Sequence, residues 1–166
     1  MNGFFVRTAG ERDLAEVSRL LAETWHATYD VLYGADQVAT ITASWHTVEA
    51  LRQRLAKPHS EFLVADDGER LPAMAFAAAA GEGRTVLLHQ LYVLPAFQRL
   101  GIGSELLGEV EGCFPTADLI RVEVEEANLK ALSFYTSRGF VTAASTGVTA
   151  LDAPERPALL LEKRLA

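Results

Sequence analysis

The sequence is poor in cysteine, and this shortage removes two kinds of site. The only cysteine is Cys113, so neither an intrachain disulfide nor a cysteine-based metal site can form. The four histidines, His26, His46, His59 and His89, show no metal-ligand spacing. We therefore expect no metal, and the single thiol agrees with a reducing, cytoplasmic compartment.

Net positive charge and long apolar runs are also missing. The chain carries a net charge of -7 and has a pI of about 5.1. Proteins that bind duplexes usually present a basic face, so nucleic acid is not an expected partner. The longest apolar stretch, Ala73 to Ala80, is too short to cross a bilayer, and the first residues do not resemble a signal peptide. We expect no membrane partner either.

What remains is an ordinary globular composition. The chain has 166 residues, of which 49% are hydrophobic, enough for one sizeable core. Apolar periodicity and turn residues divide it into alternating elements. Strands are predicted at Phe4–Thr8, Glu61–Ala65, Leu71–Ala80, Thr85–Val93, Leu119–Val124, from Phe140 onward and at Ala158–Leu165, with helices after Thr8, around Val38, after Thr47, at Gly101–Phe114 and at Asn128–Arg138. This order predicts an α/β (α+β) domain with a mixed sheet and helices on both faces.

Local signals support several of these boundaries. Thr8 and Glu11 have the spacing of a capping box, and Thr47 is a candidate cap for a later helix. Between them, Gly34 is expected to end a helix. The apolar face of the first helix is formed by Leu14, Val17, Leu21 and Trp25. Pro72, near the start of a predicted strand, indicates an edge or a bulge there.

The segment from Gln98 to Gly103 is the best candidate for a binding site. It follows the strand that ends at Val93, it reads Gln-Arg-Leu-Gly-Ile-Gly, and a helix begins within it. The start of a helix exposes unpaired N–H groups and the positive end of the helix dipole, both of which suit an anion. Glycines at 101 and 103 would let the backbone approach a phosphate closely.

Three interpretations of this segment remain open on its own residues. The glycines can simply start a helix in a tight turn. They can belong to a dinucleotide-binding fingerprint, for which Glu123 stands near the expected ribose acid; Leu106 in place of a third glycine, and the long Leu94–Leu100 spacer, count against this. They can also hold the phosphates of another ligand. A nucleoside-triphosphate loop is excluded, because no Gly-Lys-Ser/Thr follows.

Two linked motifs make the sequence similar to the GNAT family of N-acetyltransferases. The first runs from Leu91 to Gly103 and continues to Leu106-Leu107; the second runs from Val122 through Asn128 and Ala131 to Phe134-Tyr135-Thr136-Ser137-Arg138-Gly139-Phe140. The resemblance implies a twisted sheet of about six to seven strands whose two central parallel strands splay apart. It also implies a single acyl-CoA N-acyltransferase domain over residues 1–166.

In this family the first motif holds coenzyme A, so the resemblance implies acetyl-CoA as the acyl donor and direct transfer to an amine within a ternary complex. Acceptors would be small-molecule amines or protein and peptide amines. The residue before Gly101 is often basic in the family and is Leu100 here, beside Arg99; the second hairpin strand often carries glycine and here reads Pro72-Ala73-Met74-Ala75. The implied cofactor-binding residues are Leu91, Tyr92, Val93, Gln98, Arg99, Leu100, Gly101, Ile102, Gly103, Ser104, Asn128, Ala131 and Tyr135.

Two residues are implied as catalytic. Tyr135 matches the family tyrosine that protonates the departing thiolate, which a phenol can do because it keeps its proton at neutral pH. Glu123 is the preferred base, directly or through water, and His89 or a chain of waters is the alternative. A bulge at Leu94-Pro95 would free backbone N–H groups near Val93 to stabilise the thioester oxygen.

The acceptor side is less specified. Aromatic residues gather at the end of the first helix, and Tyr29 and Tyr33 are candidate substrate-binding residues together with His89. An alternative function is a non-catalytic acyl-CoA-binding sensor or interaction module, which would carry the same motifs. Edge strands predicted near the C-terminus would also permit a homodimer. Neither the amine nor the acyl group is determined by these residues.

Overall fold

The structure is a computed structural model, and it describes residues 3–146 and 158–165. Within these residues the chain forms seven strands and five α-helices. The strands are β1 (Phe5–Thr8), β2 (Ser60–Asp66), β3 (Ala73–Ala80), β4 (Thr85–Val93), β5 (Leu119–Glu125), β6 (Val141–Thr146) and β7 (Ala158–Arg164). The helices are α1 (Leu14–Tyr33), α2 (Ala35–Trp45), α3 (Val48–Leu55), α4 (Ile102–Gly112) and α5 (Leu129–Ser137).

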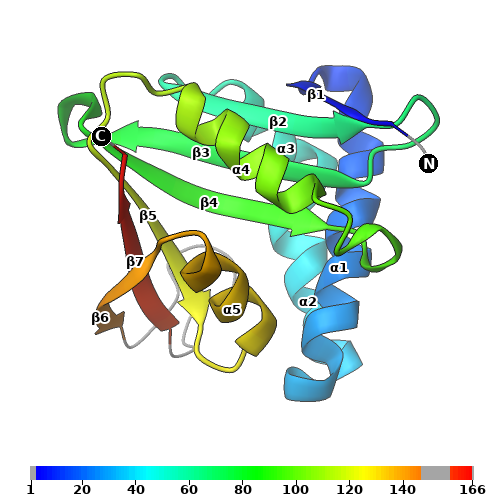
Figure 1. Cartoon of the computed structure of the whole chain (residues 1–166). Coiled ribbons are helices and arrows are strands. Elements are labelled where there is room, and N and C mark those ends of the chain that lie inside the picture. The colour runs from blue at the N-terminus through cyan, green and yellow to red at the C-terminus, as the bar shows by residue number, and fades with distance from the viewer. Residues whose placement is uncertain (1–2, 147–157, 166) are drawn as a thin grey trace.

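All seven strands belong to one sheet with the order β1-β2-β3-β4-β5-β7-β6. Among the strands of the described residues, β4 and β5 form the only parallel pair, and every other neighbouring pair is antiparallel. Figure 1 shows α4 and α5 on one face of this sheet and α1, α2 and α3 on the other. The predicted mixed α/β sheet, with helices on both faces, is therefore confirmed.

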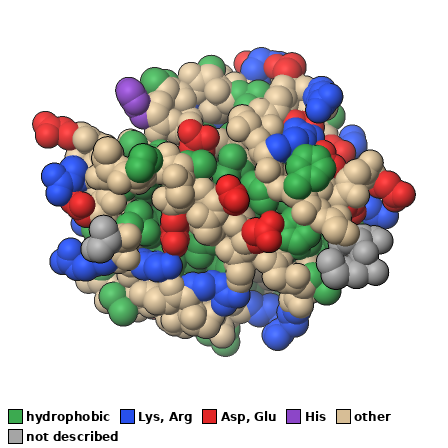
Figure 2. Space-filling model, turned by 45° about the horizontal axis from the view of Figure 1, so that its top comes forward, with side chains coloured by type: hydrophobic (Ala, Val, Ile, Leu, Met, Phe, Trp, Pro, Cys, Tyr) green, Lys and Arg blue, Asp and Glu red, His purple; other side chains and the backbone are tan. Residues whose placement is uncertain are grey.

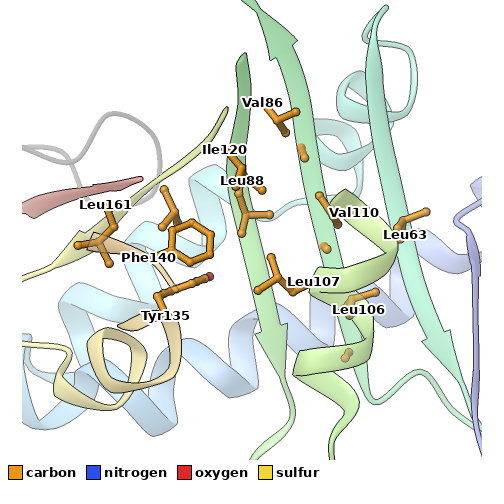
Figure 3. Packing of buried hydrophobic residues seen from close by; sticks show 14 of the residues in the cluster. Leu63, Val86, Leu88, Leu106, Leu107, Val110, Ile120, Tyr135, Phe140 and Leu161 are labelled. Atoms are coloured by element: carbon orange, nitrogen blue, oxygen red, sulfur yellow. The ribbon is translucent and has the colours of Figure 1, made fainter. Parts of the chain in front are cut away.

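The core is divided by the sheet. Figure 3 shows the part on the α4 and α5 side, where Leu106, Leu107 and Val110 of α4 pack near strand residues and Tyr135 lies beside Phe140. On the other face, α1 and α3 pack against β2 and β3. Each fully buried large apolar side chain contributes about 1.5–3 kcal/mol, so both layers hold the central strands in place.

Most local signals act as the sequence predicts. The stripe on α1 is buried at Leu14, Val17, Leu21 and Trp25, and α1 ends at Gly34, whose φ of +87° suits glycine. At the start of α3 the hydroxyl of Thr47 accepts a hydrogen bond from the amide of Ala50 at 3.1 Å.

The capping box predicted at Thr8 and Glu11 is wrong. The carboxylate of Asp13 instead accepts the Gly10 amide at 2.7 Å, while it also pairs with Arg7 at 2.9 Å. A 3-10 turn over Glu11–Asp13 then leads into α1. The ion pair fixes Asp13 in this role, and a pattern of capping residues alone does not reveal such a partner.

Pro72 marks neither an edge strand nor a bulge. β3 begins after it, at Ala73, and lies between β2 and β4. The Pro72 carbonyl accepts the Leu94 amide at 2.8 Å, which closes the ladder where β4 ends. The bulge expected at Leu94-Pro95 is wrong as well, because the Leu94 amide is bonded to the Pro72 carbonyl and continues the ladder.

The central feature is the separation of β4 from β5. The two strands pair only from Thr85 to Leu88 against Leu119 to Val122, and beyond this point they have no shared ladder. At the same level β4 has a bulge on its β3 side, because Phe76 pairs with Gln90 while Ala77 pairs with Leu88, which leaves His89 as the extra residue. The sheet therefore opens at its centre.

Candidate functional site

A cleft of about 1260 Å³ lies where β4 and β5 part. Its walls come from α1, from the second half of β4, from the loop into α4, from β5 and from α5. Parallel strands that separate leave backbone groups without ladder partners, which a ligand can then bond. The cleft is thus a consequence of the incomplete pairing of β4 and β5.

One end of the cleft is formed by the start of α4. The helix begins after Gly101, which has a φ of +88° and has no side chain to cap the first-turn amides. The preceding loop is held by the Gln98 side chain, whose Nε2 donates to the Val93 carbonyl at 3.0 Å. Arg99 has a φ of +64°, a conformation that is strained for a non-glycine residue. The first-turn amides of α4 thus have no side-chain cap at this end of the cleft, which is the kind of helix start that suits an anion.

Gly103 allows α5 to approach this helix start. A Cβ added at Gly103 would meet ring carbons of Phe134 at 3.3 and 3.4 Å and a methyl of Val93 at 3.6 Å. The small residue therefore serves packing between α4, β4 and α5, in addition to the expected approach of a ligand.

Arg138 is a further positive group at the same end of the cleft. Its guanidinium lies over the Phe134 ring at 4.3 Å, and its Nε donates to the Ser104 hydroxyl at 2.8 Å. It also donates to Ser137 at 2.6 Å. The sequence places Arg138 in the second motif but carries no signal of its position, because only the packing of α5 on α4 brings it to the first turn of α4.

Tyr135 lies on the α5 wall with only 6% of its surface exposed. Its ring makes edge contacts with Phe134 and Phe140 at 5.1 and 5.2 Å. Figure 3 shows the side chain extending from α5 toward β4, with its hydroxyl at the leading end. The ring is therefore held firmly, and the hydroxyl lies at the wall of the cleft.

Glu123 lies on β5 and lines the cleft from the other face of the sheet. Side chains alternate along a strand, and the neighbouring Val122 and Val124 pack in the core on the Tyr135 side. Glu123 is exposed and points away from that core. Tyr135 and Glu123 thus approach the cleft from opposite sides of the sheet.

His89 also lines the cleft, at the bulge of β4. Its ring stacks on Phe76 at 5.6 Å. Burial, together with the positive charges of Lys57 and Arg54, lowers the pKa of His89 to about 4. The imidazole is consequently neutral at pH 7 and is a weaker base than the sequence alone suggests.

Another wall of the cleft is formed by α1. Tyr29 is buried in the wall of the cleft and accepts a hydrogen bond from Asn128 Nδ2 at 3.2 Å. The Oδ1 of Asn128 accepts the Ala131 amide at 3.2 Å and so caps the start of α5. Tyr33 is not part of the lining, but it stacks on Tyr29 with ring centroids 5.5 Å apart and donates a hydrogen bond to Glu125.

The structure brings most of the predicted site residues to this one cleft. Leu100 is 65% exposed and Ile102 is buried in the core, and neither side chain lines it. Glu125 and Gln90 also line the cleft, although no signal in the sequence singles them out: Glu125 lies within the second motif without an implied role, and Gln90 lies just before the first motif. The predicted residues in the lining are Tyr29, His89, Leu91, Tyr92, Val93, Gln98, Arg99, Gly101, Gly103, Ser104, Glu123, Asn128, Ala131 and Tyr135.

Other kinds of site find no support in the described residues 3–146 and 158–165. No group of His, Cys, Asp and Glu side chains there could hold a metal ion. No helix there has the length and apolar character needed to span a bilayer. Figure 2 shows acidic side chains across the middle of one face, with Lys and Arg mostly nearer its edges.

Comparison with known proteins gives a consistent result. Residues 30–150 match the model of an acetyltransferase (GNAT) domain. The fold is similar to PaiA N-acetyltransferase from Thermoplasma acidophilum, solved in complex with coenzyme A, with a TM-score of 0.84, 21% identity and coverage of 98% of this chain and 99% of that chain.

Two further structures show the same fold at low identity. An acetyltransferase of the GNAT family from Staphylococcus aureus Mu50 has a TM-score of 0.76 and 14% identity, over 99% of this chain and 100% of that chain. Ard1 from Thermoplasma volcanium has a TM-score of 0.69 and 17% identity, over 98% of both chains. Among curated proteins, none matches the sequence.

Proposed function

Because the chain belongs to the GNAT family of acetyltransferases, we propose that it transfers an acetyl group from acetyl-CoA to a primary amine, with both substrates bound at once. The observation that carries this is the opening of the sheet between β4 and β5, with an uncapped helix start at one end and Tyr135 on its wall. We also propose that residues 1–166 act as one acyl-CoA N-acyltransferase domain.

Coenzyme A fits the chemistry of the cleft. The pyrophosphate would bind the amides at the start of α4, from Gly101 to Ser104, with Arg138 and Arg99 supplying positive charge. The pantetheine arm would lie along Leu91 to Val93, where β4 has left β5 and its backbone can bond the arm. The thioester would then lie near the point of the opening, next to Tyr135.

The reaction forms one bond and breaks one. The amine nitrogen attacks the thioester carbon, the new C–N bond forms, and the C–S bond breaks to release the thiolate of coenzyme A. Tyr135 donates its phenolic proton to this sulfur, and the proton lost by the amine returns to the phenolate through solvent. Because Tyr135 and Glu123 lie on opposite sides of the sheet, the acid and the incoming amine would act from opposite sides of the thioester.

The need for a base depends on the acceptor. Deprotonating a lysine-like amine with a pKa near 10.4 costs about 4–5 kcal/mol at pH 7, whereas a backbone α-amine near 7.7 costs about 1 kcal/mol. We assign this role to Glu123, directly or through water, because it lines the acceptor side of the cleft. His89, with its pKa lowered to about 4, is the weaker candidate.

The negative charge on the thioester oxygen would be stabilised at the bulge of β4. A bulge leaves a backbone group outside the ladder, and the bulge at His89 lies at the level where β4 and β5 part. The end of β4 is less suited to stabilise this charge, because the Leu94 amide there is bonded to Pro72. We therefore assign the stabilisation of the oxyanion to the backbone at the bulge.

The test is the release of free thiol from acetyl-CoA with a panel of amines. Turnover with at least one amine is expected, and Tyr135→Phe should reduce kcat by about 10²-fold or more with little change in the affinity for acetyl-CoA. Binding of acetyl-CoA without turnover across a broad panel would favour the non-catalytic sensor. Failure to bind coenzyme A, with binding of a nicotinamide nucleotide instead, would overturn the proposal.

A further inference from the structure

The acceptor end of the cleft contains two buried polar side chains that the proposed reaction does not use. Gln90 follows the bulge of β4 and lies opposite Phe76, which packs on the α1 side of the sheet. Glu125 is the last residue of β5 and is bonded to Tyr33 of α1. Both line the cleft on this same face, one on each of the separating strands.

Gln90 has an exposed fraction of only 2%. Neither its Oε1 nor its Nε2 has a hydrogen-bond partner among the described residues. A buried amide without partners destabilises a folded protein. A bound substrate that forms hydrogen bonds with this amide would supply the partners that its atoms lack.

Glu125 is a carboxylate that is 5% exposed, and the Tyr33 hydroxyl donates to it. Tyr33 stacks on Tyr29 with an interplanar angle of 8°, and Tyr29 packs on Trp25 with centroids 4.5 Å apart. A buried carboxylate beside aromatic rings is suited to an ammonium group, which gains an ion pair and contact with π faces together.

We propose that the acceptor is a short, flexible amine that carries a second ammonium group, such as a linear diamine or polyamine. The carboxylate of Glu125 binds the distal ammonium, and the Oε1 of Gln90 accepts a hydrogen bond from the amine that reacts. This inference rests on the proposed acetyl transfer, and it specifies the substrate class of that same site. Gln90 on β4 and Glu125 on β5 each bind one amine of the acceptor, so an acceptor with a single amine can use only one of the two residues.

The experiment compares a linear diamine of four methylenes with n-pentylamine, which has similar length but one amine, and with a short peptide bearing a free N-terminus. Thiol release is measured with saturating acetyl-CoA. The diamine should have a kcat/KM about 10-fold or more above that of n-pentylamine. Glu125→Gln, which keeps the size of the side chain and an acceptor for Tyr33, should remove most of this preference.

Gln90→Leu provides an independent readout. It should reduce kcat/KM for both amines by about 10-fold, leave acetyl-CoA affinity unchanged and raise the melting temperature. A purely structural glutamine would show the stability change without the kinetic one. The matched control is Glu126→Gln, since Glu126 is exposed and does not line the cleft; it should alter neither rate nor preference.

The outcomes separate the two proposals. Equal kcat/KM for the diamine and n-pentylamine, a better rate with the peptide, or a diamine preference that survives Glu125→Gln would overturn the inference while the acetyl transfer stands. Acetyl-CoA binding with no thiol release from any amine would overturn the acetyl transfer and the inference together.

Discussion

Arg138 offers a direct test of how this protein would hold the phosphates of coenzyme A. The residue before Gly101 is often basic in the family, and here it is Leu100. The guanidinium of Arg138 is already fixed near the first turn of α4 by the Phe134 ring and the Ser104 hydroxyl. It would therefore lose little freedom when a phosphate binds, which favours a sizeable contribution.

The magnitude follows from the kind of bond. Hydrogen bonds that involve a charged partner contribute about 1.5–3 kcal/mol, which corresponds to a factor of about 10–150 in Kd. Because Arg138 is only partly buried, solvent screening should keep the effect of Arg138→Ala near the lower end, at about 10- to 30-fold weaker binding of acetyl-CoA. The loss of its contact with Phe134 should cost the fold only about 0.5–1 kcal/mol.

The assay is calorimetric titration with coenzyme A, together with kinetics using acetyl-pantetheine, a donor without the pyrophosphate. Arg138→Ala should weaken the binding of coenzyme A and leave the rate with acetyl-pantetheine unchanged. Arg138→Lys should have an intermediate affinity for coenzyme A, because it keeps the positive charge but loses the planar guanidinium. Arg84→Ala is the control, since Arg84 pairs with Asp118 outside the cleft. An equal loss with acetyl-pantetheine, or unchanged affinity for coenzyme A, would refute the assignment.

Two further predictions concern stability. Burial and the nearby Arg54 lower the pKa of His46 to about 3, so below pH 7 the unfolded state takes up a proton at this residue more readily than the folded state. The free energy of unfolding should therefore fall by about 2 kcal/mol from pH 7 to pH 5 through this group. Urea titrations of His46→Met should show a dependence of stability on pH that lacks this contribution. An unchanged slope would contradict this. In α4, Gly108→Ala should stabilise the protein by about 0.5–1 kcal/mol, because no atom beyond its own helix lies within 4 Å of the position that the new Cβ would take. Gly103→Ala should show no such gain, because its new Cβ would crowd the Phe134 ring. Thermal melts that show equal gains for the two variants would be inconsistent with this packing.

Several features could be predicted from the sequence because they depend on neighbours along the chain. The cap by Thr47, the end of α1 at Gly34 and the buried stripe from Leu14 to Trp25 are set by residues within a few positions of each other. The cap at Gly10 could not be predicted in the same way. It depends on Asp13, which is held by Arg7, a residue of the neighbouring strand β1.

The candidate site also combines features that depend on neighbouring residues in the chain with features that depend on tertiary contacts. The two glycines of the first motif can be recognised in the sequence, because a helix start suited to an anion needs a particular local backbone. Tyr135 is singled out only by the resemblance to the GNAT family. The position of the bulge was wrong, since the bulge depends on how β3 and β4 pair and not on Pro95. His89 keeps its place in the cleft, but burial beside positive charges lowers its pKa.

The elements, the mixed sheet and the two motifs can be predicted from the sequence, because periodicity, caps and turns act over short distances. The position of β7 between β5 and β6, and the separation of β4 from β5 after Leu88 and Val122, become evident in the folded structure. The same packing brought Arg138 to the start of α4 and enclosed Gln90 and Glu125 in one cleft. These contacts join residues far apart in the chain, and their energies depend on burial and on pairing that no local pattern encodes.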